Sequence, residues 1–237
     1  MSRSLDFDVT AQPDEVTCGP ACLHSVYRYY GDELSLDALI ADVRMLDAGG
    51  TLDVYLANHA LERGYRASLY SYNLQLFDPT WHRLPAADLA ERLEAQAKAK
   101  REPKLRQATR GYLRFLELGG RLHFDDLQPA LIRRYLKQGK PIMTGLSSTY
   151  LYREMRELPD TNQDDDVLGE PAGHFVVLYG YNREKRLVEV ADPYRPNPLG
   201  NDLYYAVDMH RLIGAVLLGC LTYDANLLII EKPNSDA

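Results

Sequence analysis

The residue best suited to covalent chemistry in this sequence is Cys18, which stands at the start of a predicted helix with Pro20 in the first turn. Proline is tolerated there because the first N–H groups of a helix have no intrahelical partner. These unpaired N–H groups, together with the positive end of the helix dipole, favour a thiolate. Because the thiolate is the nucleophilic form of cysteine, the sequence predicts a nucleophile at Cys18.

A second group with the right chemistry is the side-chain amide of Gln12, six residues before Cys18. If the intervening loop folds back toward the helix, this amide and the backbone N–H of Cys18 form an oxyanion hole. Loss of one such donor typically costs about 2.7 to 4 kcal/mol of transition-state stabilisation.

The general base is predicted at His174, which follows Gly173 and opens a β-rich segment. Asp192 ends the next β-rich segment, so a hairpin would bring its carboxylate beside the imidazole. A carboxylate in that place holds one ring nitrogen and orients the other toward the sulfur.

Hydrophobic periodicity and turn residues predict the elements that must position these groups. Ser35 and Thr51 are the expected N-caps of two of the helices. The predicted helices span 19–30, 35–46, 51–63, two segments of 85–118 divided at Pro103, 128–138 and 209–218. The predicted strands span 141–146, 175–181, 187–190, 203–207 and 227–230, with a hairpin turn at 182–185.

Helices that precede antiparallel strands indicate an α+β fold with the active site in a cleft between two lobes. We expect a single domain over 1–237, with a helical lobe at about 10–138 and a β lobe at about 139–232. The segment 85–118 is rich in Ala, Lys, Arg and Glu, which favours an inserted, solvated helical hairpin over a partner-binding helix.

Taken in order, Gln12, Cys18-Gly19-Pro20-Ala21, Gly173-His174-Phe175-Val176-Val177 and Asp192-Pro193 resemble the papain-like cysteine peptidases. The resemblance is strongest to the bacteriocin-processing, double-glycine leader peptidases of cysteine peptidase family thirty-nine, which are bacterial. It implies a papain-like fold, a nucleophile at Cys18, a base and acid at His174, an orienting carboxylate at Asp192 and an oxyanion donor at Gln12.

Composition excludes several other classes of function. The formal net charge of −7 disfavours nucleic acid or an anionic membrane as the main partner. The longest nearly apolar run, 212–221, is too short to cross a bilayer, and the N-terminus does not resemble a secretory signal. Three cysteines are too few for a disulfide framework, so we expect a cytoplasmic protein.

The remaining candidate residues favour structural roles. Cys22 and Cys220 are expected to be core thiols, and Cys18, Cys22 and His24 lack the spacing of a structural zinc site, so no metal or cofactor is expected. The acidic segment 160–170 has no calcium-loop spacing and favours a solvated loop, with a lid or a selector of basic substrates as the alternative.

The sequence therefore predicts a thiol hydrolase that cleaves a peptide or isopeptide-like bond in a peptide substrate through a thioester acyl-enzyme. Two alternatives stay open. The thioester can be intercepted by an amine, as in the papain-like phytochelatin-synthase relatives, or the chain can be a non-catalytic peptide-binding domain of the same fold. The sequence does not indicate an oligomeric state.

Overall fold

A computed structural model describes residues 2–47, 49–200 and 202–233. Its strands are β1 (Ser2–Ser4), β2 (Arg66–Ser71), β3 (Arg121–His123), β4 (Ile142–Ser147), β5 (Gly173–Asn182), β6 (Leu187–Ala191), β7 (Tyr204–Asp208) and β8 (Asn226–Glu231). They form one eight-stranded sheet in the order β3-β2-β8-β4-β5-β6-β7, and β1 pairs with the end of β5. All pairs are antiparallel except β2 with β3.

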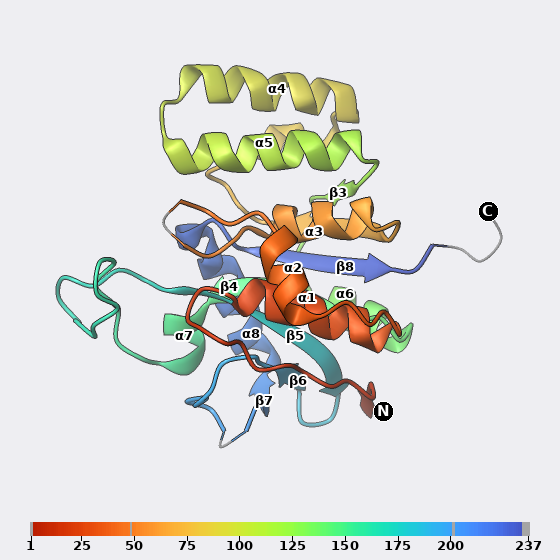
Figure 1. Ribbon diagram of the computed structural model, residues 1–237, viewed down its shortest axis with the longest axis vertical. Coiled ribbons are helices and arrows are strands. Elements are labelled where there is room, and N and C mark those ends of the chain that lie inside the picture. Colours follow the sequence, from red (N-terminus) through yellow and green to blue (C-terminus); the bar gives the residue numbers. More distant parts are fainter. Residues whose placement is uncertain (1, 48, 201, 234–237) are drawn as a thin grey trace.

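The helices are α1 (Cys18–Tyr29), α2 (Leu36–Asp42), α3 (Asp53–Glu62), α4 (Ala86–Ala99), α5 (Pro103–Glu117), α6 (Pro129–Lys137), α7 (Ser148–Tyr152) and α8 (Met209–Leu218), with 3-10 turns η1 (Pro79–Arg83) and η2 (Gly219–Thr222). Helix α1 packs on β5, α3 on β2 and β8, and α8 on β4. The antiparallel α4 and α5 stack beyond α3 at the top of Figure 1. None of the helices in the described ranges is long and apolar enough to cross a membrane.

The predicted α+β class is confirmed, and the predicted hairpin is present as β5 and β6. The division into a helical and a β lobe is less sharp than expected, because β2 and β3 arise within the segment predicted to be helical. Strand β2 is buried over residues 67–71 although Ser68 and Ser71 are polar, so hydrophobicity alone does not mark this short segment as a core strand. No finding tests the single-domain organisation, which stays a prediction.

Two helix predictions need correction. Helix α2 ends at Asp42, before Val43 turns into extended backbone, and Ser35 caps its start by accepting from the N–H of Ala38. Thr51 is not the N-cap of α3: that position belongs to Leu52, while the Thr51 hydroxyl donates to the carbonyl of Arg44 at 2.7 Å. Thr51 therefore fastens the preceding loop instead of starting the helix.

Helix α1 lies in the centre of the fold, and its residues 18–27 are all buried. A helix that is buried all round must approach its neighbours closely. Gly19 permits this, because a Cβ at Gly19 would come within 2.6 Å of Cγ2 of Thr51 and 3.1 Å of Leu56. The residue after Cys18 therefore sets how deeply the start of α1 enters the core.

The insert 85–118 forms the two helices that Pro103 predicted, but only α4 is mainly solvated. Helix α5 packs on α3 and buries Leu105, Tyr112 and Phe115. Gly111 allows that contact, since a Cβ there would come within 2.6 Å of Val54. The insert is therefore part of the hydrophobic core and not a separate hairpin.

Candidate active site

The edge of the sheet on the left of Figure 1 collects the ends of several elements. Strand β5 begins there and its antiparallel neighbour β6 ends there, while α1 starts at the same edge. This arrangement brings together Cys18, His174 and Asp192, which the sequence predicted as the nucleophile, the general base and the orienting carboxylate.

Cys18 is the first residue of α1 and is 9% exposed. The turn before it is shaped by Asp14, whose carboxylate accepts from the N–H of Val16 at 3.0 Å and the hydroxyl of Thr17 at 2.8 Å. Thr17 occupies the N-cap position without a side-chain cap. The first N–H groups of α1 therefore stay available to the sulfur and to an oxyanion beside it.

His174 is buried, with Nε2 donating to Oδ1 of Asp192 at 2.8 Å. Because an ionised carboxylate only accepts hydrogen bonds, this contact assigns the proton to Nε2 and leaves Nδ1 for Cys18. Cys18 is the second charged neighbour of the ring. Burial lowers the pKa of His174, but the charges of Asp192 and Cys18 and the hydrogen bond to Asp192 outweigh burial and raise it to about 10. The imidazolium is therefore the stable form at neutral pH.

The carboxylate of Asp192 is fully buried and accepts four hydrogen bonds from neighbouring residues. Oδ1 accepts from Nε2 of His174 and from the backbone N–H of Tyr194 at 3.0 Å, while Oδ2 accepts from the hydroxyls of Tyr152 at 2.6 Å and Tyr205 at 2.9 Å. Burial by itself raises the pKa of Asp192, but the charge and hydrogen bond of His174, with the other donors, bring it below the ordinary value. The carboxylate therefore stays ionised in the core.

Gln12 lies on the loop that leads into α1. Its backbone N–H donates to the carbonyl of Pro193 at 2.9 Å, which ties this loop to the residue after Asp192. Its Nε2 donates to the carbonyl of Asp14 at 2.7 Å. An amide nitrogen carries two hydrogens, so one remains for a substrate oxygen.

The tyrosines around the site were not predicted from the sequence. The rings of Tyr152 and Tyr194 lie 6.2 and 6.1 Å from the imidazole of His174, centre to centre. Tyr194 follows Asp192 by two residues in the sequence, and this short separation alone predicts that it lies close to the carboxylate. Tyr152 and Tyr205 carry no such signal, because only the tertiary fold brings them to Asp192.

The other two cysteines differ from each other. Cys22 is a core thiol, as predicted: its Sγ donates to the carbonyl of Phe175 at 3.3 Å, and burial raises its pKa. Cys220 is half-buried in η2, so the prediction of a core thiol is wrong at this position. The apolar stretch around it is the exposed end of α8, where Leu217 and Leu218 also reach solvent.

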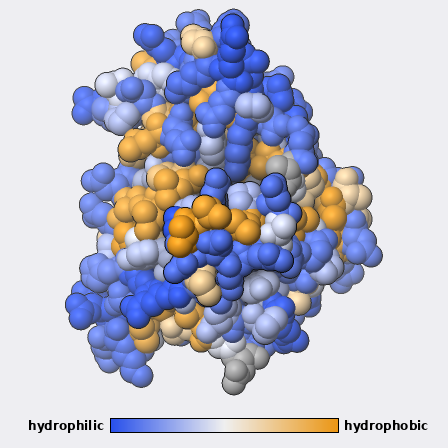
Figure 2. All heavy atoms as spheres, turned by 90° about the vertical axis from the view of Figure 1, so that its left-hand side faces the viewer, coloured by the Kyte–Doolittle hydropathy of each residue, from blue (hydrophilic) through white to orange (hydrophobic). Residues whose placement is uncertain are grey.

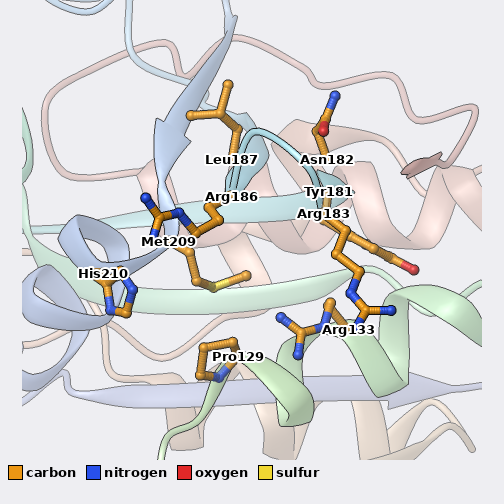
Figure 3. A pocket seen from close by; sticks show the side chains of 9 residues that line it. All are labelled: Pro129, Arg133, Tyr181, Asn182, Arg183, Arg186, Leu187, Met209 and His210. Atoms are coloured by element: carbon orange, nitrogen blue, oxygen red, sulfur yellow. The ribbon is translucent and has the colours of Figure 1, made fainter. Parts of the chain in front are cut away.

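A small cavity of about 60 Å³ lies at the opposite end of β5 from His174 (Figure 3). Arg133, Arg183 and Arg186 are among its lining residues. Because it lies at that far end of β5, the cavity does not belong to the Cys18 and His174 site.

In the described ranges, no group of three or more His, Cys, Asp or Glu side chains has the arrangement of a metal site.

Two family models match the sequence. The Peptidase C39 family matches residues 6–90 and the Peptidase C39 like family matches residues 109–211. The chain is a C39-type cysteine peptidase. Gln12 and Cys18 fall in the first matched segment of this peptidase, and His174 and Asp192 fall in the second.

The chain of this C39-type peptidase is similar to solved structures of cysteine peptidases. A C39-like peptidase from Bacillus anthracis has a TM-score of 0.50 at 13% identity, covering 98% of each chain. Xylellain, a cysteine protease from Xylella fastidiosa, has a TM-score of 0.45 at 15% identity, covering 98% of this chain and 86% of xylellain.

A third similar structure is a double glycine motif protease from an AMS/PCAT transporter in complex with the leader peptide. It has a TM-score of 0.48 at 14% identity, covering 98% of this chain and 95% of that one. No curated protein sequence matches the chain.

Proposed function

We propose that this peptidase hydrolyses a peptide bond with Cys18 as nucleophile, His174 as general base and acid, Asp192 as the orienting carboxylate and Gln12 as an oxyanion donor. The observation that carries the proposal is the place of one imidazole between a sulfur at a helix start and a buried carboxylate 2.8 Å from Nε2. A thiolate and an imidazolium in contact are the reactive form of a thiol peptidase.

The proposed reaction has two steps. The Cys18 thiolate attacks the carbonyl carbon, and the oxyanion accepts from the Cys18 N–H and the free Nε2 hydrogen of Gln12. His174 gives its proton to the leaving amine as the C–N bond breaks, which leaves a thioester on Cys18. His174 then removes a proton from water, the hydroxide oxygen attacks the thioester, and the acid product leaves as the sulfur regains its thiolate form.

A peptide substrate is supported by the surface around this edge. Val16, Met155, Val167 and Leu168 are between 42 and 76% exposed, and all lie in segments that surround the start of α1 or of β5. Figure 2 faces this edge and shows apolar side chains gathered across its middle. Exposed apolar side chains that gather in one place mark a binding surface. The side chains of an extended peptide can pack against such a surface.

The acidic segment is proposed to select the substrate. Asn162 of this segment donates to Oε2 of Glu15 at 2.7 Å, so the loop reaches across to the turn just before Cys18. Glu157 pairs with Asp164 and Glu170 through the backbone, and burial and the nearby carboxylates raise its pKa. Negative charge beside the site favours peptides with basic residues.

The source and location of the protein stay proposals. A bacterial source rests on the sequence resemblance. A cytoplasmic location is supported by the three cysteines, which are all free, as in a reducing compartment. The net charge of −7 supports a partner other than nucleic acid.

The test is labelling with one equivalent of iodoacetamide at pH 6, followed by peptide mapping. Selective alkylation of Cys18 over Cys220, which is the half-buried matched control, supports an activated thiol. Equal alkylation of the two would remove the proposal. Incubation with a peptide library then reads hydrolysis from product masses, and Cys18→Ala must abolish it while Cys220→Ala retains it.

A further inference from the structure

We propose that Tyr152 and Tyr205 are positioning residues of the active site, which hold the carboxylate of Asp192 in the orientation and ionised state that His174 requires. This inference rests on the proposed function, in which Asp192 orients His174. The hydroxyl of each tyrosine donates to Asp192, so each hydroxyl acts on His174 through that carboxylate.

The two oxygens of Asp192 have separate sets of partners. Oδ1 serves the imidazole and the backbone N–H of Tyr194, whereas Oδ2 is held by the Tyr152 hydroxyl at 2.6 Å and the Tyr205 hydroxyl at 2.9 Å. The side chain of Asp192 has no exposed surface. The tyrosines are therefore the protein donors that satisfy the second oxygen of this buried charge.

This pair fixes the plane of the carboxylate. With Oδ1 alone held, the carboxylate can rotate about its last bond and carry Oδ1 away from Nε2. Two donors on Oδ2 from different elements, α7 and β7, oppose that rotation. Helix α7 is itself anchored, because Arg211 of α8 donates to the carbonyls of Leu151 at 2.8 Å and Tyr150 at 2.7 Å.

The two tyrosines also affect the ionisation of Asp192, in addition to its orientation. Burial raises the pKa of both hydroxyls, so each stays protonated and donates. Removing a donor leaves a buried anion less well satisfied, which raises the pKa of Asp192 and in turn lowers the pKa of His174. The titratable groups that face His174 and Asp192 are Cys18 and Cys22 of α1, Tyr152 of α7, Tyr194, Tyr205 of β7, and Asp224 between η2 and β8.

The experiment compares Tyr152→Phe, Tyr205→Phe and the double variant with wild type. Tyr70→Phe is the matched control, because it removes a hydroxyl that is also hydrogen-bonded, at 2.7 Å to Tyr135, but lies in β2. The first measurement is the titration of His174 by NMR of protein labelled with ¹⁵N-histidine. The second is the pH dependence of Cys18 alkylation by iodoacetamide, read by peptide mapping.

We expect the pKa of His174 to fall by about one pH unit in each single variant and further in the double variant. Loss of one hydrogen bond to the Asp192 carboxylate changes the protonation equilibrium beside it by about tenfold, which corresponds to one pH unit. The pH dependence of Cys18 alkylation should shift as well, because the imidazolium is the counterion of the sulfur. Tyr70→Phe should leave both unchanged. A merely structural role would lower the melting temperature without moving either titration.

The outcomes separate this inference from the proposed function. If wild-type Cys18 is not selectively alkylated at pH 6, the proposed function itself fails. If wild-type Cys18 reacts as expected but His174 titrates identically in wild type and both single variants, only the role of the tyrosines is overturned. Should the double variant not fold by circular dichroism, the two single variants decide.

Discussion

Asp53 and Asp224 converge on one point beneath the start of β5. Oδ2 of Asp53 and Oδ1 of Asp224 each lie 3.1 Å from the place that a Cβ on Gly145 would occupy. Both carboxyl groups are buried, and neither oxygen of Asp53 accepts a hydrogen bond from any of the residues that the structure describes. Burial raises the pKa of both, and the charge of Asp224 raises that of Asp53 further. The pair is therefore a buried acid couple that favours protonation.

Asp224 makes the stability of the fold depend on pH. Its pKa is raised from 3.8 to about 7, so between these values the folded state holds a proton that the unfolded state has lost. The free energy of unfolding should therefore fall as the pH rises from about 4 to about 7, by on the order of 4 kcal/mol. Urea unfolding at pH 4.5, 6 and 8 measures this dependence.

The variant Asp224→Asn should reduce that dependence and raise the stability at pH 8 relative to wild type, while Asp53, whose pKa is also raised by burial, contributes the remaining slope. Asp160→Asn, at an exposed position of the acidic segment, should retain the wild-type slope. Parallel slopes for wild type and Asp224→Asn would contradict the assignment.

The pH dependence of catalysis should report the contact between His174 and Asp192. The imidazolium form is retained below its pKa of about 10 and lost above it, so kcat/KM should stay high through neutral pH and decline near pH 10. Asp192→Asn removes the carboxylate charge. It should move the alkaline limb down toward the ordinary histidine value and lower kcat/KM by at least about a hundredfold. Asp202→Asn, which alters an exposed partner of Arg195, is the control, and an unmoved alkaline limb in Asp192→Asn would count against the contact.

Gln12 should act on the transition state more than on substrate binding. Gln12→Ala removes one oxyanion donor, which should lower kcat by about 10² to 10³ with little change in KM. Gln107→Ala removes a glutamine whose Nε2 donates to Asp47 on the surface, and it should leave both constants unchanged. A rise in KM at constant kcat would assign Gln12 to ground-state binding instead.

The acidic segment should affect the choice of substrate. Glu157 lies just before this segment and carries a carboxylate close to those of Asp164 and Glu15. Glu157→Gln removes that carboxylate, so turnover of peptides with lysine or arginine should decrease relative to that of acidic peptides. The comparison uses paired peptides that differ only in those residues, at two salt concentrations. An unchanged ratio of the two rates would exclude selection by this charge.

Local sequence signals correctly predicted the position of several helices and of the hairpin. Pro20 in the first turn marked the start of α1, and the polar turn at 182–185 marked the hairpin that carries His174 and Asp192 to one edge. Helix 209–218 was predicted with its observed bounds. These predictions succeeded because caps, turns and hydrophobic periodicity act over a few residues and do not depend on distant contacts.

The sequence by itself determined which chemical groups this peptidase has and where its helix start and hairpin fall. The tertiary structure alone decided what surrounds them. Tyr152 and Tyr205 reach Asp192 from positions 40 and 13 residues away, and β2 is a buried strand although it includes the polar residues Ser68 and Ser71. Such contacts depend on how buried faces pack against one another, and a buried charge takes its donors from whichever side chains the packing brings within reach.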